Sequence, residues 1–266
     1  MGAQVRSRQE DMDSIQTVSY PEHGNDDCFT VEDSSFWFRH RNRCITQLVA
    51  NFRPPKDTIL DVGGGNGFVS RALQDAGFET TLLEPGPAGV RNARSRGVRS
   101  VVEGKLDESS FAPNTIPSIG LFDVLEHIEA DEAFLELIHS RLIPAGKLYI
   151  TVPAYNWLWS HEDVHAGHFR RYTLCYLRKM LAKSLFKVEF ASYMFCILPP
   201  AVFLLRSIPY RLGFSGAPSA RMASDHRNRG FLGASLSAEL KLLQKGISLP
   251  MGGSCLVAAA KLTKVV

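Results

Sequence analysis

The stretch Thr58-Ile59-Leu60-Asp61-Val62-Gly63-Gly64-Gly65-Asn66-Gly67-Phe68 runs from apolar residues through an acid into glycines at alternate positions. This pattern predicts a strand that feeds a tight turn and then opens a helix, where glycine lets the backbone turn sharply. A second apolar run ends at Glu84. A carboxylate at the tip of the next strand can accept hydrogen bonds from both hydroxyls of a ribose. Together the two features predict a nucleoside-containing cofactor above the ends of a parallel sheet.

The glycine spacing decides between kinds of nucleoside site. A dinucleotide fingerprint would place its third glycine at position 68, which is Phe68, and a P-loop would end in Gly-Lys-Ser/Thr rather than Gly67-Phe68-Val69. The remaining pattern, Asp-x-Gly-x-Gly-x-Gly, resembles the first motif of class I S-adenosylmethionine (AdoMet) methyltransferases. The alternative interpretation is a glycine-rich turn that binds no ligand.

Composition limits the classes of protein that remain. The chain has 266 residues, 45% of them hydrophobic, which suits one large domain or a domain with a substantial insertion. A net charge of +3 without a clustered basic face does not favour nucleic acid as a partner. The five cysteines are scattered without a C-x-x-C pair, so we expect neither a zinc site nor a disulfide framework. These features, with a polar first segment, predict a cytoplasmic protein.

Strand and helix patterns alternate along most of the chain. Residues 1–30 form a polar segment, and residues 31–266 are expected to form one domain. Helical patterns cover about 31–52, 67–76, 87–96, 128–142, 173–184 and 235–245, and strand patterns cover about 57–62, 80–84, 98–103, 118–123, 147–153, 186–193 and 254–262. We expect an irregular loop, rich in aromatic residues and histidine, at 154–172. This alternation predicts a doubly wound α/β sheet.

Further motifs extend the resemblance to class I methyltransferases over roughly residues 30–262. They are Phe36-Trp37-Phe38 with Arg41-Asn42-Arg43, Phe122-Asp123-Val124-Leu125-Glu126-His127-Ile128, Gly167-His168-Phe169-Arg170-Arg171-Tyr172-Thr173 and Leu249-Pro250-Met251-Gly252-Gly253-Ser254. The chain is similar to the ubiquinone-pathway and generic methyltransferase-domain branch. The resemblance implies a Rossmann-like sheet of seven strands whose last strand is antiparallel. It also implies an insertion, residues 194–253, between strands six and seven.

The resemblance assigns the cofactor contacts by position. It implies that Asp61 orients the AdoMet ammonium, that the glycines let the backbone pass the methionine part, and that Glu84 holds the ribose. It further implies adenine contacts near the third strand, an acid beside the methyl group, an aromatic lid and a cation for the cofactor carboxylate. The residues in question are Gly63, Gly65, Gly67, Lys105, Leu106, Asp123, Trp37 and Arg41. The alternatives are a solvated Lys105, core packing for Trp37 and a surface ion pair for Arg41.

Histidines supply the candidate general bases. We expect His127 or His168 to take a proton from the methyl acceptor, because histidine titrates near neutral pH. Capping and local hydrogen bonding are the alternative roles for Glu126 and His127. A divalent metal at Asp123, Glu126 and His127 is a further alternative, and we assign no metal. The candidate acceptor contacts all lie in the 154–172 loop: Tyr155, Trp159, Arg171 and Tyr172.

The reaction and its acceptor are constrained less closely. The histidines favour O-methylation of a small molecule, with N- or C-methylation of a metabolite or sugar, or a non-catalytic binding subunit, as alternatives. The apolar stretch 193–205 is broken by Pro199 and Pro200 and is too short to span a bilayer. It either covers a pocket or contacts a membrane interface, and it suggests an amphiphilic acceptor.

Overall fold

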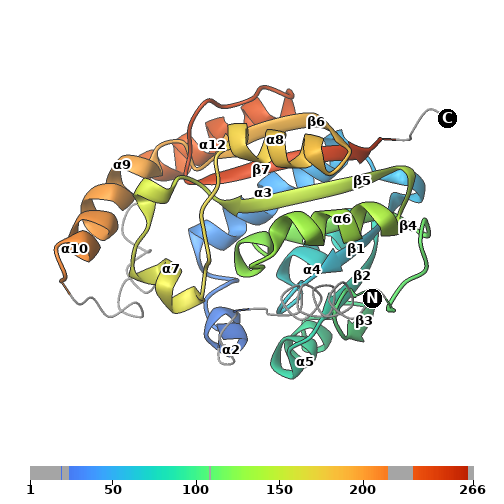
Figure 1. Cartoon of the computed structure of the whole chain (residues 1–266). Coiled ribbons are helices and arrows are strands. Elements are labelled where there is room, and N and C mark those ends of the chain that lie inside the picture. Colours follow the sequence, from blue (N-terminus) through green and yellow to red (C-terminus); the bar gives the residue numbers. More distant parts are fainter. Residues whose placement is uncertain (1–18, 20–23, 108, 215–229, 263–266) are drawn as a thin grey trace, which may run out of the picture.

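The computed structural model describes residues 19, 24–107, 109–214 and 230–262. Its centre is a seven-stranded sheet in the order β3-β2-β1-β4-β5-β7-β6 (Figure 1). The strands are β1 (Thr58–Val62), β2 (Glu79–Glu84), β3 (Ser100–Glu103), β4 (Ile116–Phe122), β5 (Leu142–Pro153), β6 (Phe186–Met194) and β7 (Ser254–Lys261). Strands β1 to β5 pair in parallel, and β7 runs antiparallel to both β5 and β6. The predicted fold, including the antiparallel last strand, is confirmed.

Helices cover both faces of the sheet because successive strand residues point to opposite sides. On one face, Ile59 packs with residues of α3 (Phe36–Asn51), α4 (Phe68–Asp75) and α12 (Phe231–Gln244). On the other face, Leu60 packs with residues of α6 (Asp131–Arg141) and α8 (Leu174–Lys183). Helix α5 (Pro87–Ser95) packs against β2 and β3. Burial on both faces explains why the strands are continuous apolar runs in the sequence.

Two short helices lie where the sequence predicts polar or irregular chain. Helix α2 (Gly24–Phe29) falls in the polar first segment, and it packs against α5. Helix α7 (His161–Ala166) falls in the predicted 154–172 loop, so the expectation of irregular chain is wrong for this turn. Ser160 and Asp163 form a capping box at its start, and Gly167, at φ +75°, ends it.

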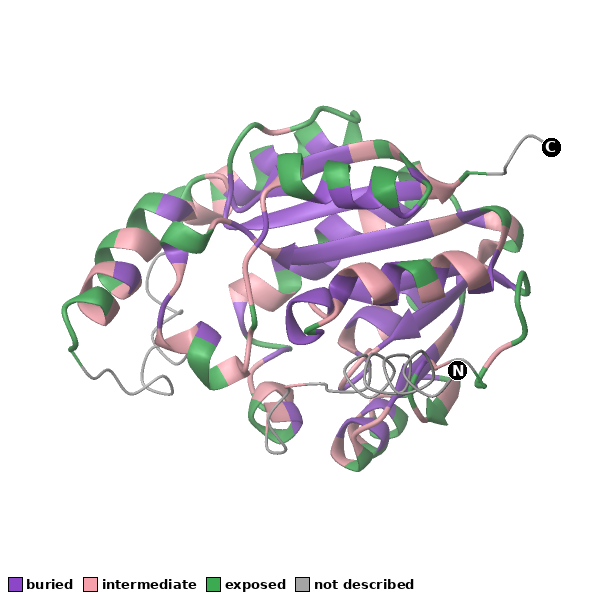
Figure 2. Ribbon diagram, viewed as in Figure 1, coloured by how far each residue is buried: buried purple, intermediate pink, exposed green. Residues whose placement is uncertain are grey.

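The segment between β6 and β7 forms a mostly helical arm. It contains α9 (Leu198–Val202), a π-helical turn (Phe203–Ser207), α10 (Ile208–Arg211) and then α12, while residues 215–229 lie outside the described part of the chain. In Figure 1, α9 and α10 extend away from the sheet, and Figure 2 shows more exposed residues there than along the strands. None of the helices in the described ranges combines the length and apolar character that crossing a bilayer requires.

Candidate active site

The carboxyl ends of β1, β2 and β4 open into one large cavity of about 1390 Å³. Pockets for a single small ligand usually measure about 300–1,000 Å³, so this volume suits two ligands side by side. The lining combines the glycine turn, α2, the start of α3, α7 and part of the helical arm. This position, at the carboxyl ends of the parallel strands, is where ligands bind in open α/β sheets.

The glycine turn adopts the backbone conformation that the sequence predicts. Gly63, Gly65 and Gly67 have φ values of +66°, +52° and +72°, a region that other residues rarely adopt. Gly63 and Gly65 line the cavity, whereas Gly67 does not. A Cβ atom at Gly67 would lie 2.7 Å from Cγ2 of Val98, so this glycine allows close packing against the residues that precede β3 rather than contact with a ligand.

Asp61 offers one free carboxylate oxygen at the cavity wall. Its side chain is 1% exposed, and Oδ2 accepts a hydrogen bond of 2.6 Å from the Ser70 hydroxyl. Oδ1 has no hydrogen-bond partner among the residues that the structure describes. Burial raises the pKa of Asp61 to about 6, against the lowering effect of Ser70. A buried oxygen of this kind fits a ligand that brings a donor, such as an ammonium group.

Glu84 is held at the tip of β2 by two backbone amides. The amide of Gly65 donates to Oε2 at 2.9 Å, and the amide of Gly86 donates to Oε1 at 2.8 Å. Burial raises the pKa of Glu84, while these bonds and one from Asn25 lower it. These three bonds use three of the roughly four lone-pair sites of the carboxylate, so one site is left to accept from a ligand hydroxyl.

Helix α2 lies over the glycine turn and Glu84, and the sequence analysis did not predict this cover. The side chain of Asn66 donates to the backbone oxygen of Asn25 at 2.7 Å and to Oε1 of Glu32 at 3.2 Å. Arg96 pairs with Glu32 at 2.7 Å. Asn25 and Glu32 both line the cavity and are buried. The signal was weak because single polar residues in a polar segment do not stand out.

Two candidate cofactor contacts pair with each other at the end of β4. Nε of Arg41 lies 2.5 Å from Oδ2 of Asp123, and Nη2 donates to the backbone oxygen of Phe122 at 2.8 Å. Thr151 donates to Oδ1 of Asp123 at 2.8 Å. Arg41 and Asp123 both line the cavity. The ion pair expected as the alternative role of Arg41 is therefore present at the cavity, with Arg41 buried and the Asp123 side chain 34% exposed.

The other predicted cofactor contacts also lie at the cavity. Trp37 lines it and stacks on Phe195, with ring centroids 3.8 Å apart. Trp37 thus combines the wall position with the packing role that was its alternative. Lys105 and Leu106 line the cavity after β3; Leu106 is buried and Lys105 is exposed. An apolar side chain beside the third strand suits the face of an adenine ring.

The structure brings the two candidate bases together. The rings of His127 and His168 meet edge to face, with centroids 4.8 Å apart, and both line the cavity. Burial, with a smaller effect from His168, lowers the pKa of His127 to about 3, so this imidazole stays neutral. Glu126 is fully buried beside them, and its Oε2 has no partner in the described part of the chain. Burial and the nearby Asp123 raise the pKa of Glu126 well above its usual value.

Asp163 orients His168 from the far side. Nδ1 of His168 lies 2.9 Å from Oδ1 of Asp163, and Arg171 donates to both Asp163 oxygens at 2.7 and 2.8 Å. Burial alone would raise the pKa of Asp163, but the bonds from His168 and Arg171 lower it to about 2. The ionised carboxylate can only accept, so Nδ1 carries the hydrogen and Nε2 of His168 is left as a proton acceptor.

Most of the predicted acceptor contacts lie elsewhere. Arg171 lines the cavity, although its guanidinium is committed to Asp163 and to the backbone oxygen of Ala154. Tyr155, Trp159 and Tyr172 are not among the lining residues of the described structure. The Tyr172 hydroxyl instead donates to Oδ2 of Asp131 at 2.9 Å in the core. We therefore no longer assign these three aromatic residues to the acceptor.

The structure groups the potential metal ligands differently from the sequence alternative. Among the described residues, donor atoms of Glu126, His127 and His168 lie within 4.8 Å of one another. Asp123, the third member of the alternative set, is paired with Arg41. His161 and His165 lie four positions apart on α7, but in the described ranges no group of three potential ligands includes them.

Curated relatives match part of this chain. The mitochondrial ubiquinone biosynthesis O-methyltransferase of Schizosaccharomyces pombe is 28% identical over 100 residues, which is 35% of this chain and 36% of the relative. The ubiquinone biosynthesis O-methyltransferase of Xanthomonas axonopodis pv. citri is 29% identical over 113 residues, 40% of this chain and 47% of the relative. The chain thus spans less than half the length of the curated relatives that it matches.

Solved structures share the fold at low identity. An AdoMet-dependent methyltransferase from Thermotoga maritima, described as a possible histamine N-methyltransferase, superposes with a TM-score of 0.56 and 14% identity, covering 91% of this chain and 100% of that one. The phosphoethanolamine N-methyltransferase 2 of Haemonchus contortus in complex with AdoMet gives a TM-score of 0.56 and 19% identity, covering 95% of this chain and 60% of that one.

A family model gives the most specific match. The model of the methyltransferase domain matches residues 37–189, which is more than half of the chain and includes the glycine turn, Glu84 and the His127–His168 pair. The chain belongs to the methyltransferase domain family.

Proposed function

We propose that this chain transfers a methyl group from AdoMet to an oxygen atom of a small-molecule acceptor. The observation that carries the proposal is one continuous cavity that joins the acids at Asp61 and Glu84 to the Asp163–His168 pair. The family match and the ubiquinone O-methyltransferase relatives support both the reaction and the donor. The unpartnered Oδ1 of Asp61 fits the ammonium of AdoMet, and Glu84 fits its ribose.

In this mechanism the protein orients two ligands and moves one proton. AdoMet, when bound, would supply a methyl group that is already activated by its sulfonium, and S-adenosylhomocysteine would be the leaving product. Asp61 and Glu84 fix the donor, while Trp37 and helix α2 exclude water from it. Nε2 of His168 removes the hydroxyl proton of the acceptor, and Asp163 stabilises the imidazolium that forms. His127 stays neutral, so it adds no positive charge beside the developing one.

The base distinguishes oxygen from nitrogen acceptors. A hydroxyl must lose its proton as the new bond forms, whereas an amine need only arrive unprotonated. An acid-oriented histidine is therefore more useful for O-methylation than for N-methylation. C-methylation, which also needs a base, and a binding role without catalysis remain the competing functions.

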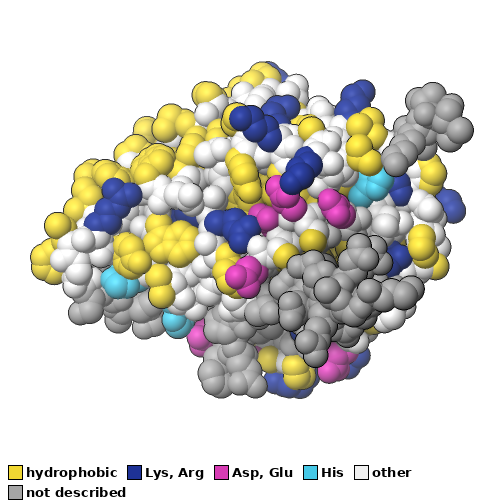
Figure 3. Space-filling model, viewed as in Figure 1, with side chains coloured by type: hydrophobic (Ala, Val, Ile, Leu, Met, Phe, Trp, Pro, Cys, Tyr) yellow, Lys and Arg dark blue, Asp and Glu magenta, His cyan; other side chains and the backbone are white. Residues whose placement is uncertain are grey.

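We further propose that the acceptor is amphiphilic. Beyond His168 the cavity is lined by Glu162 and His165 of α7 and by Val202 and Arg206 of the helical arm. Next to Val202 and Arg206, Leu204 and Leu205 are 60% and 68% exposed. Figure 3 shows hydrophobic side chains gathered over α9 and α10. An acceptor with a polar head in the cavity and an apolar tail along this arm matches both surfaces.

The same arm suits contact with a membrane interface. Residues 198–212 contain two arginines and no acidic residue, and their exposed leucines face outward. Short amphipathic segments with basic residues lie on bilayer surfaces rather than crossing them. A cytoplasmic location stays a prediction, and one of the relatives is named as mitochondrial.

Calorimetry with AdoMet, followed by a methyl-transfer assay on catechols, phenols and amines, tests the proposed function. We expect AdoMet to bind, Glu84→Gln to weaken that binding, and methylation to occur on hydroxyl groups. Binding without transfer to any acceptor, including lipid-linked ones, would favour the non-catalytic role. Failure of the folded protein to bind AdoMet would contradict the proposal itself.

A further inference from the structure

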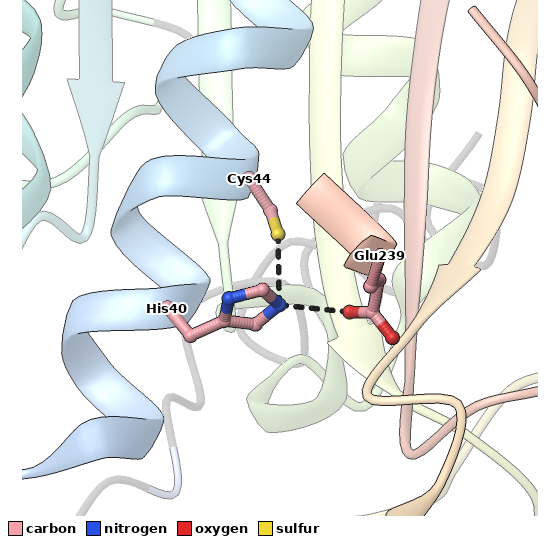
Figure 4. Close-up of side chains that lie close together, drawn as sticks. All are labelled: His40, Cys44 and Glu239. Carbon is pink, nitrogen blue, oxygen red and sulfur yellow. Dashed lines mark hydrogen bonds and ion pairs between the residues drawn. The ribbon is translucent and has the colours of Figure 1, made fainter. Parts of the chain in front are cut away.

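A buried group of polar side chains lies outside the cavity, between α3 and α12. His40 and Cys44 are one turn apart on α3, and Glu239 faces them from α12 (Figure 4). Nε2 of His40 lies 2.8 Å from Oε1 of Glu239 and 3.3 Å from Sγ of Cys44. All three side chains are buried, and none lines the cavity described above. This group has no role in the proposed reaction.

Nε2 of His40 faces one partner that needs a hydrogen-bond donor, the Glu239 carboxylate, and one that needs an acceptor, the Cys44 thiol. If Nε2 carries a hydrogen, it can donate to Glu239, and the thiol hydrogen of Cys44 then has no acceptor there. If Nε2 is unprotonated, it can accept from the thiol, but its lone pair then faces a carboxylate. In the described structure the Cys44 sulfur has no other hydrogen-bond partner. A metal cation between the His40 nitrogen, the Cys44 sulfur and the Glu239 oxygen removes this conflict, because each atom then donates an electron pair to the metal.

The carboxylate is already fixed in the way that a metal ligand requires. The amide of Phe195 donates to Oε1 of Glu239 at 2.6 Å, and the amide of Cys196 donates to Oε2 at 2.7 Å. Such outer hydrogen bonds orient ligands in metal sites. The Cys196 thiol also contacts this carboxylate; burial, followed by Glu239, raises the pKa of that thiol to about 12.

We propose that His40, Cys44 and Glu239, whose ligand atoms all lie within 4.8 Å of one another, bind a divalent metal ion of the zinc type. A thiol, an imidazole and a carboxylate are the ligands that zinc takes in proteins. Bonds of about 2.0–2.3 Å place tetrahedral ligand atoms about 3.3–3.6 Å apart, so the distances from Nε2 of His40 to Glu239 and to Cys44 each grow by about 0.5 Å or less. Binding releases the Cys44 proton to solvent, and His40 binds in its neutral form.

The site would join the helical arm to the rest of the domain. Glu239 belongs to the segment between β6 and β7, whereas His40 and Cys44 belong to α3. Phe195, whose amide holds Glu239, also stacks on Trp37 at the cavity wall. A metal here would therefore stabilise the wall against which AdoMet binds without touching the ligand. Spacing along the chain did not indicate this site, because His40 and Glu239 are 199 positions apart.

Metal content and Co²⁺ absorption test the proposal on untagged, full-length protein kept reduced with a phosphine. We expect one zinc per chain after gel filtration. When Co²⁺ is added to the metal-free protein, we also expect a thiolate-to-Co²⁺ charge-transfer band together with the visible absorption bands of tetrahedral Co²⁺. Cys44→Ala should abolish the charge-transfer band and weaken Zn²⁺ binding by more than about 100-fold. Removing only a residue that hydrogen-bonds to a metal ligand weakens metal affinity by about 10–100-fold. Cys255→Ala, which removes another buried thiol, is the matched control and should change neither.

The thiolate band also separates this site from the second group of potential ligands. Glu126, His127 and His168 contain no sulfur, so Co²⁺ bound there cannot give that band. Glu239→Gln keeps the shape of the side chain and serves as a second variant if Cys44→Ala does not fold. Folded, reduced wild-type protein that holds no zinc and shows no thiolate band with Co²⁺ would overturn the proposal. The three side chains would then form a hydrogen-bonded link between α3 and α12.

Discussion

Asp61 is a buried carboxylate whose charge lowers the stability of the folded protein at neutral pH. Because the folded state holds the Asp61 proton more tightly than the unfolded chain, this residue costs nothing below about pH 4. Above its folded pKa of about 6 it costs about 1–3 kcal/mol. We therefore expect Asp61→Asn to raise the melting temperature of the ligand-free protein at pH 7. Thermal unfolding at pH 4 and pH 7 checks this, because the gain should vanish at the lower pH.

The same substitution should weaken cofactor binding. In the proposed site the ionised Asp61 accepts from the AdoMet ammonium, and a charged hydrogen bond is worth about 1.5–3 kcal/mol, or roughly 10–100-fold in affinity. In the wild type, AdoMet affinity should fall as the pH drops below about 6, where Asp61 becomes protonated. Calorimetry between pH 5 and pH 8 measures both effects. An Asp61→Asn protein that binds AdoMet as tightly as the wild type would exclude the ammonium contact.

His168 should matter for the chemical step and little for AdoMet binding. General bases contribute about 10²–10⁴-fold, so we expect His168→Gln to lower kcat by that order while the AdoMet Kd stays within about twofold. His161→Gln is the control, because His161 bonds the backbone oxygen of Phe214 and lies outside the cavity lining. Equal activity of the two variants would remove His168 from the mechanism.

At the scale of elements, Arg96 holds helix α2 and the residues that follow it over the cavity. Arg96 pairs with Glu32 and Asp33 and lies over the ring of Phe29. Removing it leaves Glu32 as a buried, unpaired carboxylate, which is strongly destabilising for local structure. We expect Arg96→Ala to weaken AdoMet binding by about tenfold or more and to speed amide exchange in residues 24–35. Arg91→Ala, an exposed change on α5, the helix that Arg96 directly follows, should do neither.

The sequence predicted the strands and the turn well because their signals are local. Asp61, the three glycines and Glu84 sit at strand ends, where apolar runs stop abruptly. Helix α2 was missed because its burial depends on Arg96 and Asn66, which no periodic pattern links to it. Tyr172 was assigned to the acceptor because it lies in a polar motif. Its hydroxyl turns instead toward Asp131, a contact across 41 positions that only the folded chain defines.

For the whole molecule, we expect the helical arm to bind the protein to membrane surfaces. We expect the wild type to co-sediment with vesicles of phosphatidylglycerol and phosphatidylcholine. The double variant Leu204→Glu and Leu205→Glu should reduce the bound fraction at least about fivefold. It replaces two exposed apolar side chains with charges that anionic lipids repel. Val102→Glu, at an exposed valine on β3, is the control. A wild type that binds no vesicles but forms a dimer in light scattering, where the double variant is a monomer, would identify the arm as a protein interface instead.

The position of β7 has a consequence for how the protein is made. This strand is the last to leave the ribosome, yet it lies between β5 and β6. Until residues 254–261 have been synthesised, β5 and β6 each present an unpaired edge, and unpaired edges invite aggregation. The proposed cofactor contacts are complete some 130 residues earlier, counting from Asp123 to Ser254. The nascent chain therefore carries the proposed cofactor contacts on a sheet that still lacks one of its inner strands.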